Sequence, residues 1–469
     1  MSETLMISVS GIRGHVGTDL TPELVARYAA AFGSWARTNS STDRPTDRPT
    51  GRPTDRPSIV LGRDARTSGA MFARAATAGL MSVGVDVVDL GIVPTPTVQL
   101  AVEYHHAAGG LILTASHNPI EWNALKFVGP DGIFLDGAAG KQVRLLAEEG
   151  PPRSSWDGLG SVREDPAAIQ RHLDAILDLP LIDVALIRTR KFRVALDCVR
   201  GAGAGAILPL LERLGCSVHG INLEMDGRFP RPPEPVPENL TQLGELVRRS
   251  GAEIGLAVDP DVDRLALVDE TGQPIGEDYT LAFAVRAVLD GRLKGGTPPT
   301  VVVNLSTSLV VEDAARVAGA RFVRAPVGEA NVARTIQEEG ALIGGEGNGG
   351  VMLPALHVGR DAPLGVALIL QVLAKTGVTV SALVGESPRY TIVKAKADRG
   401  ADLPTLYDRL RRRFSDAVVD ERDGLRLAWP DRWLHVRPSG TEPILRLIAE
   451  APTQADAQAL VAAGRELLD

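Results

Sequence analysis

A cluster of reactive side-chain types follows the apolar run "GGLIL", in the stretch "TASHNP" at residues 114–119. Ser116 stands there between alanine and His117, with an amide one position further on, and Lys126 follows in the next apolar segment. A lone loop serine is usually a helix cap or a turn hydroxyl, and no G-x-S-x-G motif of a serine hydrolase surrounds this one. A buried strand gains nothing from such a cluster. Ser116 is therefore a candidate nucleophile, and the loops described next favour phosphoryl transfer over acyl transfer.

The stretch "DPDVDR" places Asp259, Asp261 and Asp263 at alternate positions. Three carboxylates this close repel one another unless a cation lies between them, and oxygen ligands suit Mg²⁺. A calcium loop of the EF-hand type also begins D-x-D-x-D, with Glu270 at its twelfth position, but Arg264 stands where that loop needs glycine. A solvated acidic turn is disfavoured because apolar strands are expected on both sides. We therefore expect a magnesium site.

Two further loops carry polar groups suited to a sugar phosphate. In "GGEGNGG", Glu346 and Asn348 can accept hydrogen bonds from, and donate them to, vicinal sugar hydroxyls, although glycine-rich turns are common. The stretch "RPSGTEP" combines a guanidinium, two hydroxyls and turn amides, which suit a phosphate cradle as well as they suit an ordinary Ser-Gly turn. It is not a Walker loop, because G-x-x-x-x-G-K-[ST] is missing. The cradle residues are Arg437, Ser439, Gly440 and Thr441.

One glycine-rich stretch indicates a different function. In "DCVRGAGAGA", Gly201, Gly203 and Ala206 match G-x-G-x-x-G/A, and Glu224 lies near the position of a ribose-binding acid. An NAD-binding domain is therefore an alternative. It accounts for none of the other loops, so we interpret these glycines as a tight turn from strand to helix.

A β-α-β-α-β pattern of apolar strands and glycine-punctuated turns occurs three times, over residues 58–119, 191–264 and 299–350. Each third strand runs into one of the polar loops, and ligands of open α/β sheets bind beyond the carboxyl ends of strands. From about Arg389 the pattern changes. We predict an α/β protein of three consecutive doubly wound domains and a smaller C-terminal α+β domain, with boundaries at 1–160, 161–276, 277–387 and 388–469.

The bulk properties restrict the partners. A chain of 469 residues is too long for one core, and a net charge of -8 argues against nucleic acid. The chain has only two cysteines, and we see neither a secretory leader nor an apolar run long enough to span a bilayer. We therefore predict a cytoplasmic protein without a membrane partner. The repeat "TDRPTDRPTGRPTDRPS", Thr42 to Ser58, predicts an extended surface loop because proline recurs every fourth residue.

The motifs "TASHNP", "DPDVDR", "GGEGNGG" and "RPSGTEP", in this order, resemble those of the α-D-phosphohexomutases. "SGIRG" near the start and "GRDARTSG" after the first predicted strand of the 58–119 unit extend the resemblance over essentially the whole chain. The resemblance implies four domains around a central cleft, each contributing one loop. It also implies a hexose phosphate substrate, a hexose 1,6-bisphosphate that is both primer and intermediate, and a monomer or homodimer.

The resemblance further implies the roles of the site residues. Ser116 would be the phosphoserine, and its phosphoryl group would complete the shell of one Mg²⁺ held by the three aspartates. Lys126 would be the general base. The remaining positions that match the surroundings of the transferring phosphoryl group are Arg13, His117, Asn118, Asn123 and Arg264. Glu346 and Asn348 match the sugar contacts, and the cradle residues match the site of the phosphate that is not transferred.

The sugar loop departs from the commoner family pattern. Gly350 replaces a histidine found in many bacterial members, and Asn348 replaces a serine. Overall likeness to bacterial sequences that carry "DPDVDR" and "GEGNGG" favours interconversion of glucosamine 6-phosphate and glucosamine 1-phosphate, which is phosphoglucosamine mutase activity. The alternatives are phosphomannomutase/phosphoglucomutase activity of broader range and a catalytically silent sugar-phosphate-binding protein.

Overall fold

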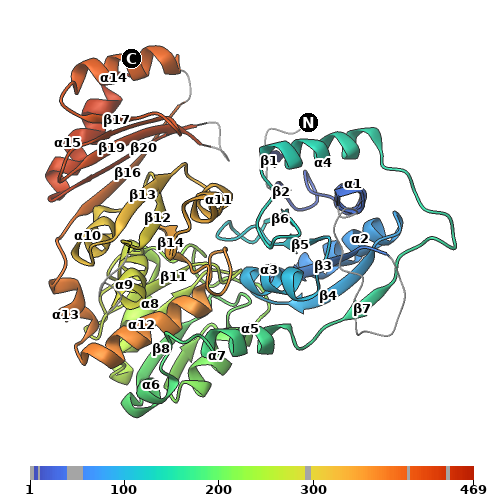
Figure 1. The fold of residues 1–469 in the computed structure, drawn as a ribbon, viewed down its shortest axis with the longest axis horizontal. Helices are drawn as coiled ribbons and strands as arrows, with labels where there is room; N and C mark the ends of the chain where they lie inside the picture. Colours follow the sequence, from blue (N-terminus) through green and yellow to red (C-terminus); the bar gives the residue numbers. More distant parts are fainter. Residues whose placement is uncertain are drawn as a thin grey trace.

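The computed structural model describes residues 5–8, 11–39, 56–290, 297–398, 402–439 and 444–468. Within them the chain forms four β-sheets, one in each of four domains that follow one another along the chain (Figure 1). The prediction of three α/β domains and a smaller C-terminal domain is confirmed. Gly440, Thr441 and residues 42–55 of the repeat loop lie outside the described residues.

Domain I contains a seven-stranded sheet in the order β1-β2-β6-β5-β3-β4-β7. Its strands are β1 (Met6–Ser8), β2 (Gly11–His15), β3 (Ser58–Arg63), β4 (Asp86–Ile92), β5 (Gly109–Leu113), β6 (Trp122–Val128) and β7 (Val162–Glu164). Its helices are α1 (Pro22–Asn39), α2 (Gly69–Met81), α3 (Thr95–Tyr104) and α4 (Gly137–Glu149). Because β7 pairs with β4, the sheet continues past residue 160, and we place the end of domain I after Glu164.

Domains II and III each contain a four-stranded sheet. Domain II has β8 (Arg193–Asp197), β9 (Ser217–Ile221), β10 (Ile254–Val258), β11 (Leu265–Val268), α5 (Ala168–Leu177), α6 (Val184–Arg190), α7 (Ala204–Arg213), the 3-10 helix η1 (Pro237–Asn239) and α8 (Thr241–Ser250). Domain III has β12 (Thr300–Asn304), β13 (Arg321–Ala325), β14 (Ile343–Glu346), β15 (Gly350–Met352), α9 (Asp278–Leu289), α10 (Leu309–Val317), α11 (Glu329–Glu339), α12 (Ala362–Thr376) and α13 (Val380–Gly385).

Domain IV is built on an antiparallel sheet in the order β16-β20-β19-β18-β17, seen at the top left of Figure 1. Its elements are β16 (Thr391–Asp398), α14 (Leu403–Arg413), β17 (Val418–Asp420), β18 (Leu425–Ala428), β19 (Trp433–Pro438), β20 (Ile444–Ala451) and α15 (Gln454–Arg465). The side chains of β20 alternate between half-buried and buried along most of its length, because one face of the sheet packs on the helices.

The first three sheets repeat one strand order. In each, the first strand of the β-α-β-α-β unit lies between the other two, all three are parallel, and an antiparallel strand follows beside the third: β5-β3-β4 with β6, β10-β8-β9 with β11, and β14-β12-β13 with β15. The loops at residues 114–121, 259–264 and 347–349 are therefore equivalent. Each one joins the third parallel strand to its antiparallel neighbour.

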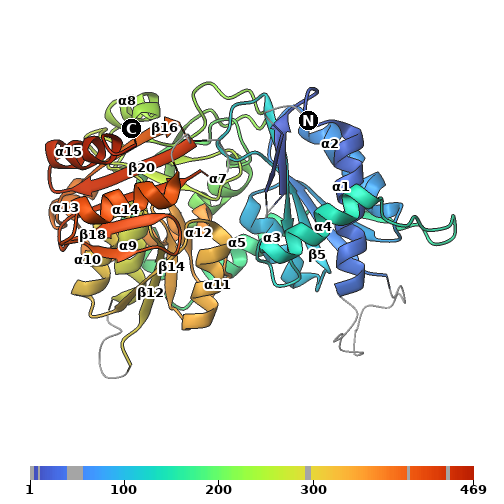
Figure 2. The same cartoon turned by 90° about the horizontal axis from the view of Figure 1, so that it is seen from above.

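The domains meet in two different ways. One continuous apolar cluster runs through domains II and III and includes much of α9 and α12. Domain I, on the right in Figures 1 and 2, meets these domains partly through polar, fully buried side chains on α3: Thr95, Thr97 and Gln99. An apolar cluster of domain I also includes Ala168 of domain II, and Ala330 of domain III packs against it. Thr95 Oγ1 donates to Asp261 Oδ2 at 3.0 Å, and its main-chain nitrogen donates to Asp261 O at 2.8 Å. Helix α3 thus sets where domain I stands relative to the acidic loop.

Candidate active site

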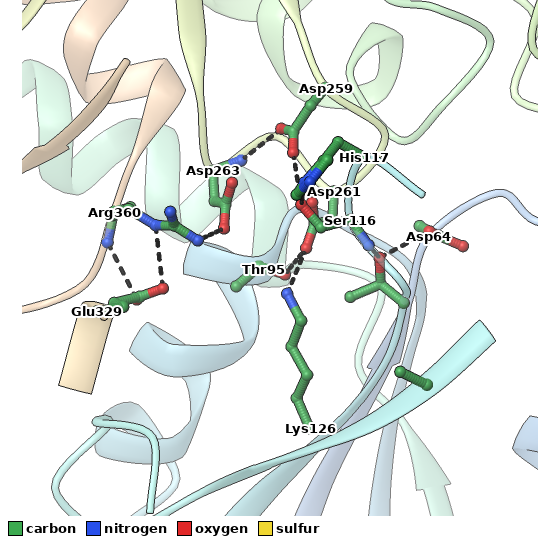
Figure 3. Close-up of polar contacts among 12 residues, drawn as sticks. Asp64, Thr95, Ser116, His117, Lys126, Asp259, Asp261, Asp263, Glu329 and Arg360 are labelled. Carbon is green, nitrogen blue, oxygen red and sulfur yellow. Dashed lines mark hydrogen bonds and ion pairs between the residues drawn. The ribbon is translucent and has the colours of Figure 1, made fainter. Parts of the chain in front are cut away.

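Ser116 lies in the loop after β5 with a backbone φ of 49°, in the left-handed region, and is 4% exposed. Its Oγ donates a hydrogen bond of 2.9 Å to Asp259 Oδ2 of domain II. His117 Nδ1 lies 3.4 Å from the same Oγ. The hydroxyl therefore points out of its own domain and into the acidic loop, as Figure 3 shows.

Arg66 holds this loop in place. Its guanidinium, 1% exposed, pairs with Asp64 through Nε at 3.0 Å. Asp64 Oδ2 also accepts from Thr114 Oγ1 at 2.7 Å, and Thr114 Oγ1 in turn accepts from Ser116 N at 2.9 Å. The two terminal nitrogens of Arg66 donate to four main-chain oxygens of the loop, those of Ser116, Asn118, Pro119 and Trp122. One buried side chain thus fixes the path of the whole loop.

The acidic loop between β10 and β11 buries all three aspartates, at 1% exposure or less. Asp259, Asp261 and Asp263 bring their oxygens within 4.8 Å of one another. Asp261 Oδ1 and Asp263 Oδ1 are buried and accept no hydrogen bond from any described residue. Unpaired buried carboxylate oxygens, with no nitrogen or sulfur donor in the set, are what a hard divalent cation requires. The residues present therefore fit Mg²⁺.

The charges of the acidic loop also call for a cation. Burial, together with the like charges of Asp263 and Asp261, raises the pKa of Asp259 well above its usual range. Burial raises the pKa of Asp261 too, but the ammonium of Lys126, 2.9 Å from Asp261 Oδ2, together with a hydrogen bond from Asp259 and the charge of Arg360, lowers that pKa overall. A proton on Asp259 would serve as a weak substitute for a metal ion.

Cationic and polar side chains surround Ser116. Arg13 Nη1, on β2, donates to Asn118 Oδ1 at 2.6 Å, and Arg264 Nη1 donates to Glu234 Oε1 at 3.2 Å. Burial, helped by Arg264 and Arg13, lowers the pKa of His117 well below its ordinary value, so its imidazole is neutral at pH 7. Asn123 is fully buried on β6, where its amide donates to Ser68 Oγ at 2.8 Å, within domain I.

The predicted sugar loop lies between β14 and β15. Glu346 is 4% exposed, and its Oε1 accepts from Asn304 Nδ2 at 2.9 Å and from Gly328 N at 3.1 Å. Its Oε2 accepts from Arg360 Nη1 at 2.9 Å. Burial raises the pKa of this carboxyl, but the charges of Arg360 and Arg264 and the hydrogen bonds from Asn304 and Gly328 N together lower it overall. Asn348 Oδ1 is buried and has no donor among the described residues.

The predicted phosphate cradle lies at the end of β19 in domain IV. Arg437 Nε is 2.9 Å from Asp423 Oδ2, and Ser439 is 7% exposed, with its main-chain nitrogen donating to Ile444 O at 2.8 Å. Gly440 and Thr441 lie outside the described residues. The cradle thus lies on the sheet of domain IV, whereas the other three loops lie on the sheets of domains I, II and III.

Three structural features of the site were not among the expected site residues. Arg66 lies within the quoted "GRDARTSG" motif, which was a signal without an assigned role. Thr95 on α3 had no signal at all. Arg360 Nη2 donates to Asp263 Oδ2 at 2.5 Å, and Figure 3 shows it between Asp263 and Glu329. Nothing in the local sequence "HVGRDAP" distinguishes this arginine from a surface one.

The glycines of "GAGAGA" support the acidic loop. Gly201 and Gly203 lie in the turn between β8 and α7, whereas Gly205 lies in α7. A Cβ on Gly201 would lie 2.6 Å from Pro260 Cα and 2.7 Å from Pro260 O. Ala202 N donates to Pro260 O at 2.9 Å. Glu224, which the alternative would assign to a ribose, pairs with Arg200, with Oε2 3.9 Å from Arg200 Nε. The close approach that these glycines allow is therefore made by the acidic loop, and the dinucleotide-binding alternative loses its support.

Comparison with known proteins gives matches over nearly the whole chain. Family models described as phosphoglucomutase/phosphomannomutase alpha/beta/alpha domains I, II and III match residues 5–151, 170–272 and 276–390, and the C-terminal domain model matches residues 392–467. A phosphoglucomutase/phosphomannomutase of Thermococcus kodakarensis is 37% identical over 465 residues, covering 98% of this chain and 97% of that protein. A probable phosphoglucosamine mutase of Methanopyrus kandleri is 35% identical over 457 residues, covering 96% and 95%.

A solved structure shows the same architecture. The crystal structure of a phosphoglucomutase/phosphomannomutase family protein from Burkholderia thailandensis superimposes with a TM-score of 0.83 at 26% identity, covering 99% of this chain and 96% of that one. In the part of the chain that the structure describes, no helix is long and apolar enough to cross a bilayer.

Proposed function

Since this chain belongs to the phosphoglucomutase/phosphomannomutase family of α-D-phosphohexomutases, we propose that it moves a phosphoryl group between O6 and O1 of a hexose through a phosphoserine at Ser116 and a 1,6-bisphosphate. One observation carries the proposal: the buried Ser116 Oγ lies 2.9 Å from Asp259, in a cluster with two unpaired carboxylate oxygens. A nucleophile of one domain thus meets a cation site of another.

The metal part of the proposal follows from the donor set. Asp259, Asp261 and Asp263, with the phosphoryl group on Ser116, would hold one Mg²⁺, which would draw negative charge from that group during transfer. The neutral His117, next to Ser116, and the two arginines whose charges act on it, Arg13 and Arg264, offer further hydrogen-bond donors. Preorganised donors of this kind supply most of the catalysis in phosphoryl transfer.

The chemical step exchanges one oxygen of phosphorus for another. The free hydroxyl of the hexose monophosphate attacks the phosphorus and gives its proton to Lys126 Nζ, which acts here as the neutral amine. The bond to Ser116 Oγ breaks, and Oγ leaves with the electron pair and takes a proton from solvent. Asp261, 2.9 Å from Nζ, stabilises the ammonium that results. After the bisphosphate has reoriented in the site, Ser116 Oγ loses its proton to solvent and attacks the other phosphoryl group. The bond from that phosphorus to the sugar oxygen breaks, and the ammonium of Lys126 returns its proton to the sugar oxygen. A trace of hexose 1,6-bisphosphate would prime the first cycle.

The remaining residues would hold the sugar in both orientations. Glu346, Asn348, Asn118 and Asn123 supply acceptors and donors for hydroxyls and phosphoryl oxygens. Arg437, Ser439, Gly440 and Thr441 would bind the phosphate that is not being transferred. Equivalent hydroxyl contacts must be made with the sugar in either orientation, so this set has to be tolerant.

We infer glucosamine phosphate as the preferred substrate. Two observations support it: the name of the Methanopyrus kandleri relative, and the buried Asn348 Oδ1 that has no described donor. An ammonium at C2 would donate a charge-assisted hydrogen bond to this acceptor, which is stronger than one from a neutral hydroxyl. The name of the Thermococcus kodakarensis relative supports the alternative, phosphoglucomutase/phosphomannomutase activity of broader range.

Phosphorus NMR tests the proposal. The Mg²⁺-loaded protein, primed with a trace of the matching 1,6-bisphosphate, is incubated in separate tubes with the 6-phosphates of glucosamine, mannose and glucose. We expect a 1-phosphate resonance that grows fastest with glucosamine 6-phosphate. It should be absent in Ser116→Ala and persist in the exposed control Ser217→Ala. Fastest growth in another tube would support the broader alternative. No turnover together with retained sugar-phosphate affinity would indicate a silent binding protein.

A further inference from the structure

Arg360 joins carboxylates from separate parts of the site. It lies in the segment between β15 and α12, is 7% exposed, and donates through Nη2 to Asp263 Oδ2 at 2.5 Å. Its Nη1 donates to Glu346 Oε2 at 2.9 Å, and its Nε donates to Glu329 Oε2 at 3.1 Å. Three nitrogens of one guanidinium therefore bind the acidic loop of domain II, the sugar loop of domain III and the first residue of α11.

Gly350 makes room for this arginine. A Cβ at Gly350 would lie 2.3 Å from Arg360 Cδ and 2.8 Å from Cγ, closer than any real side chain can approach. The φ of Gly350 is not in the left-handed region, so conformational freedom does not explain the glycine. The space beside Gly350 is occupied by the stem of Arg360. The two residues therefore form a matched pair.

Charge neutralisation alone would not need this geometry. A lysine ammonium could compensate a buried carboxylate as a point charge, whereas the planar guanidinium holds several carboxylates at fixed angles. We propose that Arg360 is a positioning residue that couples the acidic loop to the sugar loop, and that Gly350 is glycine because Arg360 needs its space. The inference deepens the proposed function, on which the roles of the two loops rest.

The coupling has a measurable consequence. Asp263 and Glu346 share the guanidinium of Arg360. A substitution at Glu346 therefore shifts the hydrogen bonds of Arg360 toward Asp263, and this alters the affinity of the acidic loop for a cation. Such coupling is reciprocal, because binding free energies at two linked sites depend on each other equally. A side chain with a merely structural role would not transmit a change between the loops.

A double-mutant cycle with Mn²⁺ as the probe tests this, with calorimetry on the unphosphorylated full chain and no sugar present. In the Arg360 background, Glu346→Gln should weaken Mn²⁺ binding about three- to tenfold, the range expected of directly coupled residues. In the Arg360→Lys background, which keeps the charge, the same substitution should change the Mn²⁺ affinity less than about twofold. Equal changes in both backgrounds, or no Mn²⁺ binding by the unsubstituted chain, would overturn the inference.

A second pair of variants covers the case in which Arg360→Lys fails to fold. Gly350→Ala displaces the arginine stem without changing any charge, and it should reduce the effect of Glu346→Gln on the Mn²⁺ affinity in the same way. Gly385→Ala is the matched control, because its Cβ meets no atom within 4 Å. Thermal unfolding of each variant identifies those that fold, and an unreduced effect in folded Gly350→Ala would overturn the inference.

The outcome is separable from that of the proposed function. Turnover of a hexose phosphate by the unsubstituted chain, together with a cycle that shows no coupling, would leave the proposed function standing and overturn only the role of Arg360. Coupling in the cycle without turnover of any hexose phosphate would support the role of Arg360 and reject the mutase.

Discussion

The conformation of Ser116 shows how much a single residue depends on its neighbours. A φ of 49° costs a non-glycine residue about 1 to 3 kcal/mol, so it persists only where the surroundings impose it. Arg66 imposes it here, through hydrogen bonds to main-chain oxygens of the same loop, two of them at 2.6 Å. The strained backbone turns Oγ out of the sheet and toward Asp259, so the strain belongs to the display of the candidate nucleophile.

Arg66→Met should lower the free energy of unfolding by about 3 to 5 kcal/mol, because it leaves Asp64 buried without its partner charge. Urea-induced unfolding measures the change, and the exposed Arg74→Met on α2 is the control, expected within about 0.5 kcal/mol of the parent. The double variant Asp64→Asn with Arg66→Met should lose less than the sum of the single changes. A loss below about 1 kcal/mol for Arg66→Met would contradict this account.

At the scale of elements, the turn between β8 and α7 is a support for the acidic loop. Pro260 packs so closely on this turn that a Cβ on Gly201 would overlap its main chain, and Ala202 N donates a hydrogen bond to Pro260 O. Pro260 stands between two of the three aspartates, so the shape of this turn affects where the carboxylate oxygens of the acidic loop lie. A sequence that matches a nucleotide-binding fingerprint serves here to pack two loops of one sheet together.

Gly201→Ala should push Pro260 away and reduce turnover about tenfold or more, because a displacement near 1 Å between reacting groups can cost about a hundredfold. Initial rates in the phosphorus NMR assay measure the effect. Gly205→Ala is the control within the same motif, because its Cβ would first meet the side chain of Met225, at 3.3 Å from Sδ. Equal rates for the two variants would show that the turn does not support the acidic loop.

At the scale of the whole molecule, the domains are joined both by apolar contacts and by buried polar contacts. Domains II and III share one apolar cluster, whereas domain I meets them through polar side chains of α3 as well as through apolar contacts with Ala168 and Ala330. Domain IV meets domain III through buried polar groups as well: Glu450 accepts from Leu309 N at 2.8 Å and from the hydroxyl of Ser308. Each buried polar group in such an interface needs a hydrogen-bond partner. Because protonation changes which groups donate and accept, the stability of a polar interface depends on pH.

His435 makes the interface between domains III and IV sensitive to pH. Its Nδ1 lies 2.8 Å from Ser306 Oγ, and its Nε2 lies 2.7 Å from Asp423 O. Burial lowers the pKa of His435 from 6.5 to about 4, with Arg437 and Arg426 adding to the effect. The imidazole is thus neutral in the folded protein at pH values where the unfolded chain already binds a proton.

The sign of the effect follows from that difference. The contribution of His435 is fully present above about pH 6.5 and is lost as the pH falls toward 4, so the free energy of unfolding should fall by up to about 3 kcal/mol over this window. Urea unfolding at a series of pH values measures it, and His435→Gln should flatten the slope. The exposed His219→Gln should not, and an unchanged slope in His435→Gln would contradict the assignment.

The sequence by itself determined the elements and the types of loop. Apolar runs with glycine-punctuated turns encode strands and helices locally, so the three β-α-β-α-β units and the polar loops after their third strands could be predicted from neighbouring residues alone. The clustering of Asp259, Asp261 and Asp263 was equally local, because alternate positions in one short loop cannot be far apart. Resemblance to a family then supplied the roles that local patterns left open.

Only the tertiary structure decided which loops touch and what holds them. Thr95 meets Asp261 across 166 positions of sequence, and Arg360 meets Asp263 across 97. No periodicity encodes such a pairing, because it depends on how whole sheets are placed after their elements have formed. Arg360 therefore looked ordinary in the sequence, Arg66 lay in a motif without an assigned role, and Gly201 matched a motif of a different function. Their positions in the folded chain show what they support.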